Sequence, residues 1–176
     1  MFKLAALLCA VGVWGQGRPA TAEEIRKADL TVFRDGRGLP VGKGTAVAGR
    51  IVYKKHCAEC HNDAGEGKEQ QYPALAGGVG SLATARPKKT VGSYWPYAAT
   101  IFDYINRSMP FDHPRSLAAD DVYSVTAFVL FLNGLVEEGR ELNEKTLPQV
   151  VMPNRNGFVP DRRPDVKAKR SGLVMK

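Results

Sequence analysis

The stretch Cys-Ala-Glu-Cys-His, residues 57–61, constrains this chain more than any other part of its sequence. It places two thiols three residues apart and follows the second at once with an imidazole. Three kinds of site use such a set of side chains: a redox dithiol, part of a zinc site, or the covalent anchor of a haem. The rest of the sequence has to decide between them.

A dithiol of the thioredoxin type follows a β-strand, and no alternating strand pattern precedes Cys57. A structural zinc site needs four ligands, yet beyond the motif the sequence offers no second ligand pair at regular spacing. Covalent haem attachment needs only this motif, because the two thiols bind the vinyl groups and the imidazole binds the iron. We therefore expect one covalently attached haem c, held by Cys57, Cys60 and His61.

A low-spin electron-transfer haem needs a second axial ligand on the face opposite His61. Met109 is the predicted ligand, because it follows an expected helix, precedes Pro110 and lies 48 residues after His61. Met152 is a weaker candidate. Histidine and methionine together fill both axial positions, so such a haem transfers single electrons and is not expected to be catalytic alone.

The first 15 residues have the layout of a secretory signal peptide: one basic residue at Lys3, an apolar run over 4–14, and small residues beyond it. The run is too short for a stable membrane anchor. We expect an exported, periplasmic protein with no membrane span once this segment is removed. Cys9 would be removed with it, which leaves two cysteines.

Glycines and prolines divide the remaining chain into helices and irregular segments. An irregular arm is expected over 16–44, an all-α domain over 45–136, and an extension with a basic tail over 137–176. Within the domain the sequence predicts three helices, at 45–56, 96–107 and 119–133, and no sheet.

The first of these helices should begin after Thr45 as its N-cap, and the second at Pro96. The third carries acidic residues in its first turn and is stopped by Gly134. The apolar residues of the first helix are expected on or near one buried face: Val47, Ile51, Val52 and Tyr53.

The formal net charge is +7, and much of it lies at the C-terminal end, where residues 161–176 hold six basic and two acidic side chains. A nucleic-acid interface would gather basic residues on a folded face, often with aromatic residues between them. We expect no nucleic-acid partner and interpret the tail as a solvated terminus or a strap for a protein partner.

Longer segments resemble class I cytochromes c: HCAECHNDAGEG, YPALAGG, INRSMPF and the final apolar helix. The resemblance implies the class I cytochrome c fold, in which the first and last helices cross and a glycine, here Gly49, allows their close approach. It also implies that Pro73 offers its carbonyl to the imidazole of His61, which fixes the ring.

The flanking segments are similar to the cytochrome subunit of the Sox sulfane dehydrogenase and of related sulfite dehydrogenases, notably in SYWPYA and MPNRNGF. This similarity implies a partner subunit with a molybdenum cofactor, which would oxidise a sulfur compound and reduce the haem, and a downstream cytochrome c or oxidase. Two departures stand out. The Sox subunit commonly carries two haem domains, whereas this chain has one motif, and Ala118 stands where relatives place a capping Thr or Ser.

Trp95 and Tyr97 have two compatible interpretations: packing on the haem edge, and donation of a hydrogen bond to a haem propionate. Two other functions remain open. The chain could be an independent electron shuttle to a terminal oxidase, or a haem sensor or enzyme from which Met109 dissociates.

Overall fold

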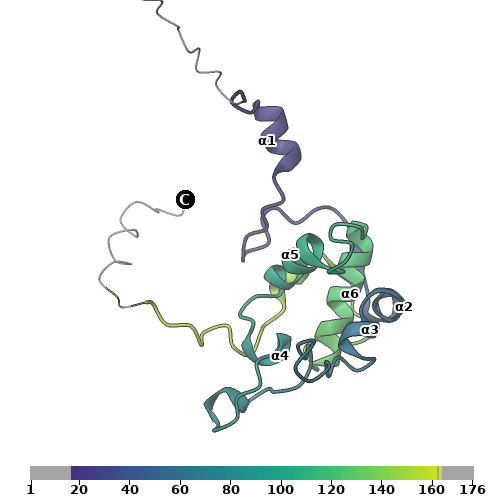
Figure 1. The fold of residues 1–176 in the computed structure, drawn as a ribbon, viewed down its shortest axis with the longest axis vertical. Helices are drawn as coiled ribbons and strands as arrows, with labels where there is room; N and C mark the ends of the chain where they lie inside the picture. Colours follow the sequence, from purple (N-terminus) through teal and green to yellow (C-terminus); the bar gives the residue numbers. More distant parts are fainter. Residues whose placement is uncertain (1–16, 162, 164–176) are drawn as a thin grey trace, which may run out of the picture.

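Three α-helices form the framework of the protein: α2 (Ala46–His56), α5 (Ala98–Ser108) and α6 (Ala119–Leu132) (Figure 1). The computed structural model describes residues 17–161 and 163. The expected signal peptide and all but a few residues of the basic tail lie outside this range. Within it, no helix is long and apolar enough to cross a membrane.

Short elements connect and flank the three helices. They are α1 (Ala22–Ala28), α3 (Ala58–His61), α4 (Val91–Tyr94) and the 3-10 turns η1 (Ser81–Ala83) and η2 (Leu147–Gln149). A two-stranded antiparallel sheet pairs β1 (Lys43–Gly44) with β2 (Leu142–Asn143). The prediction of an all-α fold with irregular extensions is confirmed, although this small sheet was not expected.

Helix α6 is the centre of the core, with α2 and α5 on either side of it (Figure 1). Every residue from Val122 to Leu130 is buried. A helix that is buried on all sides needs neighbours all round. The chain after α6 supplies further cover, because Leu142, Leu147, Val150 and Met152 are each at most 2% exposed.

Helix α2 crosses α6 at Gly49. A Cβ added at Gly49 would lie 1.8 Å from the Ser124 carbonyl oxygen and 2.9 Å from the Phe128 Cβ, so only glycine fits. One helix turn further along, the rings of Tyr53 and Phe128 pack with their centroids 5.0 Å apart. The close crossing expected from the class I resemblance is present.

The predicted buried face of α2 was partly wrong. Val47 and Ile51 are 55% and 72% exposed, while α2 buries Ala46, Gly49 and Tyr53. The physical reason is the close approach to α6, which selects the face with the small residues and leaves Val47 and Ile51 outside, while Val52 is partly buried against the core.

The second predicted helix begins two residues later than expected, and a separate short helix, α4, precedes it. Trp95 has an extended backbone, with φ −70° and ψ 129°, because the ring of Pro96 disfavours helical geometry in the residue before it. Tyr97 therefore becomes the N-cap of α5, and Met109 its C-cap, as the Met-Pro sequence predicted.

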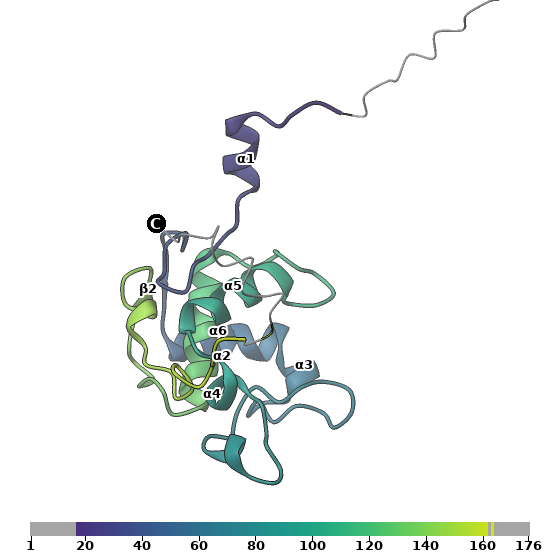
Figure 2. The same ribbon diagram turned by 90° about the vertical axis from the view of Figure 1, so that its left-hand side faces the viewer.

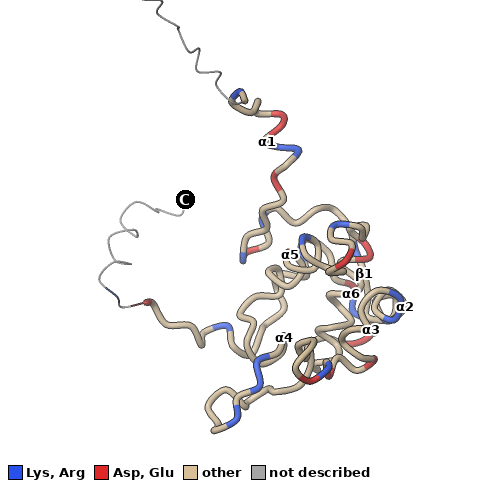
Figure 3. The backbone as a smooth tube through the Cα atoms, viewed as in Figure 1, with Lys and Arg blue, Asp and Glu red and all other residues tan. Residues whose placement is uncertain are grey.

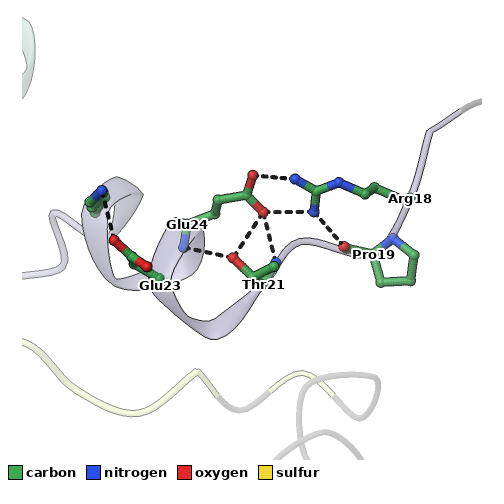
Figure 4. Close-up of polar contacts among 6 residues, drawn as sticks. Arg18, Pro19, Thr21, Glu23 and Glu24 are labelled. Carbon is green, nitrogen blue, oxygen red and sulfur yellow. Dashed lines mark hydrogen bonds and ion pairs between the residues drawn. The ribbon is translucent and has the colours of Figure 1, made fainter.

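Helix α1 stands apart from the rest of the protein, and none of its residues is buried (Figure 2). Hydrogen bonds between residues close in sequence stabilise the start of this helix. The Thr21 side chain accepts from the Glu24 backbone N–H, and the Glu24 carboxylate accepts from the Thr21 N–H at 2.8 Å (Figure 4). Arg18 donates to the same carboxylate at 2.8 Å and lowers the pKa of Glu24 to about 2.

The crossing at Gly49 predicts the effect of a single methyl group. In Gly49→Ala the new Cβ would overlap α6, so the helices must separate, and we expect a loss of about 2 kcal/mol in the free energy of unfolding. This loss should appear in denaturant unfolding of the haem-loaded protein although alanine favours helix. Gly139→Ala is the matched control, because its Cβ would meet no atom within 4 Å. Equal stabilities of the two variants would contradict the close contact.

Candidate functional site

The two cysteines and the histidine lie where α2 ends and α3 begins. Cys57 is the residue between the two helices, and its carbonyl accepts from the N–H groups of Cys60 at 3.1 Å and His61 at 2.9 Å. This single turn brings the three side chains together. Both thiols are free and half-buried, and His61 is 9% exposed.

The Nδ1 atom of His61 lies 2.9 Å from the carbonyl oxygen of Pro73. A carbonyl only accepts, so Nδ1 carries the proton and Nε2 presents a lone pair. This is the tautomer that an imidazole needs in order to bind a metal, and the carbonyl also fixes the ring orientation.

The loop between His61 and Pro73 turns back so that Pro73 reaches the imidazole. The Gly67 N–H donates to the His61 carbonyl at 3.0 Å, and the Asn62 side chain donates to the Gly67 carbonyl at 2.8 Å. Gly67 has φ +75°, and an added Cβ would lie 2.6 Å from the backbone at Ala74. A glycine is therefore required at this turn.

Tyr53 ties this loop to α2, because its hydroxyl donates to the Asn62 carbonyl at 2.8 Å. Tyr53 is 1% exposed, and burial raises the pKa of its hydroxyl. The sequence predicted that Tyr53 is buried, but it did not predict this hydrogen bond, because no sequence pattern indicates it.

The Cys57 thiol is not tuned for redox exchange. Burial, with Cys60 nearby, raises the pKa of Cys57 to about 11. Catalytic dithiols have lowered thiol pKa values instead, because the thiolate is the nucleophile. A side-chain hydrogen bond with Cys60 raises the pKa of Tyr72, whose ring centroid lies 6.5 Å from that of His61. The site therefore holds a Cys57 thiol that stays protonated beside an oriented imidazole.

Met109 is half-buried at the end of α5, and its N–H donates to the Ile105 carbonyl at 3.0 Å. Its role as the sixth ligand stays a prediction. The rival Met152 is 1% exposed and belongs to the hydrophobic core. His113 is exposed and lies beside Asp112, with 2.9 Å between Nδ1 and the carboxylate.

The two predicted aromatic residues lie at the start of α5. Trp95 is half-buried and packs edge-on against Tyr104, with the ring centroids 5.7 Å apart. Tyr97 is half-buried beneath two guanidinium groups, that of Arg34 at 5.8 Å and that of Arg155 at 5.3 Å from its ring centroid. Sequence reasoning missed both arginines, since they lie at opposite ends of the described chain.

The residues present fit a c-type haem. One turn supplies two half-buried thiols with the spacing that haem attachment requires, and the adjacent imidazole has Nε2 available for iron. The core also has a margin of partly buried apolar side chains, which includes Val52, Cys57, Leu75, Trp95 and Ile105. Such side chains suit contact with a large apolar ring.

Comparisons with known proteins agree with this geometry. The sequence model of the family described as Cytochrome c matches residues 46–133. One chain in the crystal structure of the sulfane dehydrogenase SoxCD from Paracoccus pantotrophus is 46% identical, with a TM-score of 0.79. That match covers 90% of this chain and 78% of the other, so it continues beyond the family segment into the flanking residues.

Tyr53→Phe should lower the free energy of unfolding by about 1 kcal/mol, because the buried Asn62 carbonyl loses its donor. The effect should depend on pH. The folded state raises the pKa of Tyr53, whereas the unfolded phenol ionises near pH 10. The stabilisation is therefore present in full below about pH 10 and is lost as pH rises further.

Denaturant unfolding of the haem-loaded protein at several pH values measures both effects. Tyr104→Phe is the control, because Tyr104 is 48% exposed and should show almost no change. If the difference between wild type and Tyr53→Phe stayed constant from pH 8 to pH 11, the buried hydroxyl would not be the cause.

Proposed function

The chain belongs to the cytochrome c family, and we propose that it is the haem subunit of a periplasmic, molybdenum-dependent sulfane or sulfite dehydrogenase. Membership of the family implies a covalently attached haem c and a role in electron transfer. The resemblance to class I cytochromes c and to the Sox cytochrome subunit is confirmed. The observation that carries the finer proposal is the 46% identity to a SoxCD chain over 90% of this sequence.

Each residue of the site has a proposed role. Cys57 and Cys60 form the thioether bonds, and His61 binds the iron through Nε2. The Pro73 carbonyl holds the His61 ring and increases its basicity, as partners of metal-bound histidines do. Met109 is proposed as the sixth ligand, and Trp95 and Tyr97 as the residues on the propionate side.

When bound, the haem supplies an iron that gains and loses one electron. In this proposal the protein restricts the iron to electron transfer, because both axial positions are filled. The Nδ1–H of His61 donates to the Pro73 carbonyl, which leaves Nε2 as the nitrogen that would bind the iron. A methionine in the sixth position leaves no place for substrate and favours the reduced iron.

In this proposal the partner subunit carries the molybdenum cofactor and oxidises the sulfur compound, and a downstream cytochrome c or oxidase receives the electrons. The similarity of the flanking segments supports a dedicated partner. The match to the SoxCD chain covers 90% of this chain, whereas the family match covers only residues 46–133.

The partnership can be tested by purifying the tagged, haem-loaded chain from cells that express it. We expect a molybdenum-containing subunit to co-purify in a fixed ratio, as measured by metal analysis, and sulfite or thiosulfate to reduce the haem in that complex. The isolated chain is the control and should not be reduced by either anion. A chain that purifies without molybdenum, and accepts electrons equally well from unrelated donors, would instead be an independent shuttle.

Met109→Ala should open the sixth position of the iron. We expect the reduction potential to fall, because the thioether favours ferrous iron, and the reduced protein to bind carbon monoxide rapidly. Potentiometry and the visible absorption spectrum measure both effects. Met152→Leu is the matched control and should leave the spectrum unchanged. If Met152→Leu changed the spectrum and Met109→Ala did not, Met152 would be the ligand.

A further inference from the structure

An open groove lies beside α4, between the loop at residues 78–89 and the chain that follows η2. Both segments run next to α4 in Figures 1 and 2. The groove has a volume of about 390 Å³, and its lining includes Leu82, Pro87, Lys89, Tyr94, Asn154 and Phe158. One wall lies outside the segment 46–133 that matches the family, so this groove, called the α4 groove below, is not a feature of that segment alone.

Hydrogen bonds across its base close the loop that forms the first wall. The Lys88 N–H donates to the Ser81 hydroxyl oxygen at 2.9 Å, and the Ser93 hydroxyl donates to the Lys88 carbonyl at 2.6 Å. A Cβ added at Gly78 would lie 2.4 Å from the Lys88 carbonyl oxygen, so the two ends of the loop are in close contact. The first wall is therefore formed before any partner binds.

The second wall belongs to the chain after η2 and is attached to the end of α4. The Asn154 side chain donates to the Tyr94 carbonyl at 2.8 Å, and the Phe158 ring packs edge-on against the Tyr94 ring with the centroids 5.2 Å apart. A Cβ at Gly157 would lie 1.7 Å from the Asn154 Oδ1, so this turn requires glycine. Phe158 is nevertheless 51% exposed, and Val159 is 83% exposed. Neighbouring apolar side chains that stay exposed are typical of an interaction site.

The charge around the α4 groove has one sign. Lys89 lines the groove, and Arg86 and Lys88 are exposed on the same loop. Neither residues 70–102 nor residues 145–160 contain an aspartate or a glutamate. Within the part of the chain that the structure describes, none of these three cations forms an ion pair. Figure 3 shows basic residues on the loop and no acidic residue there. The α4 groove therefore complements a negatively charged surface.

The open shape favours a protein segment over a small molecule, because small-molecule sites enclose most of the ligand surface. We propose that the α4 groove docks the molybdenum-carrying partner subunit, through an acidic segment of that subunit that places an apolar side chain against Tyr94 and Phe158. Exposed aromatic side chains of this kind are common anchors at protein interfaces. This inference rests on the proposed function, which supplies the dedicated partner, and it adds the docking surface and the chemistry of the contact.

Two features connect the groove with that partner. The match to the SoxCD chain covers 90% of this chain and so extends beyond the family segment, as the second wall does. The groove is also joined to the haem site, because the Val91 N–H at the start of α4 donates to the Leu75 carbonyl at 3.2 Å. Leu75 lies two residues after Pro73, whose carbonyl orients His61. A subunit bound beside α4 would therefore contact an element that is bonded to the loop of the haem site.

The test measures the binding of the isolated, haem-loaded chain to the purified molybdenum subunit, by titration calorimetry at low and at high salt. Two variants change the groove. Arg86→Glu/Lys89→Glu reverses the charge on the loop, and Phe158→Ala removes the exposed ring. The visible spectrum and reduction by ascorbate verify that each variant holds an intact haem.

Each groove variant has a matched control. Arg140→Glu/Lys145→Glu makes the same change in net charge, and Val151→Ala removes apolar area from the same extension as Phe158. All three control residues are exposed and none lines the groove.

We expect Arg86→Glu/Lys89→Glu to weaken binding at low salt by a factor of about 10 to 100 and to reduce its salt dependence, because the attraction to the acidic segment is lost. Phe158→Ala should weaken binding by about tenfold or more at both salt levels, since a central aromatic anchor is removed. Both controls should bind like wild type.

Wild-type affinity in both groove variants would overturn this inference and leave the proposed function intact. Equal losses in the two charge variants would also overturn it, because they would show a general effect of net charge. A dimer of the isolated wild-type chain that sedimentation detects, and that Phe158→Ala loses, would assign the groove to a second copy of this chain instead. A wild-type chain that binds no molybdenum subunit would overturn the proposed function together with the docking site, so the two failures are distinguishable.

Discussion

The contact between α2 and α6 at Gly49 sets the position of everything else in the structure. With a side chain at this point the helices could not approach, and the rings of Tyr53 and Phe128 would not meet. Tyr53 in turn holds the Asn62 carbonyl, which fixes the start of the loop that brings Pro73 to His61. The orientation of one imidazole thus depends on the absence of a methyl group on the preceding helix.

The extensions belong to the core as well as to the surface. Val32 comes from the arm, and Leu142, Leu147, Val150 and Met152 come from the chain after α6, yet all of them pack with residues of the helices. The MPNRNGF stretch therefore begins as internal packing at Met152 and becomes a surface feature at Arg155. Residues outside the family match therefore complete the core and also contact the Tyr97 ring.

Much of the architecture could be predicted, since caps, proline and the motif act locally. Thr45, the Met109–Pro110 pair and Gly134 marked helix ends correctly because each constrains its own backbone. The exposure of Val47 and Ile51 could not be predicted from hydrophobicity, because the closest packing used the smallest residues. The contacts of Arg34 and Arg155 with the Tyr97 ring could not be predicted either. They depend on how the N-terminal arm and the chain after η2 pack on the rest of the protein.

The pairing of β1 with β2 has a mechanical consequence. The chain enters the helical domain through Lys43 and Gly44 and leaves it through Leu142 and Asn143, and these residues pair side by side. The Lys43 N–H also donates to the Asp120 carboxylate at 2.8 Å, which ties the entry point to the first turn of α6. A force on the N-terminal arm would therefore be resisted at this junction before it reached α2 and the residues around His61.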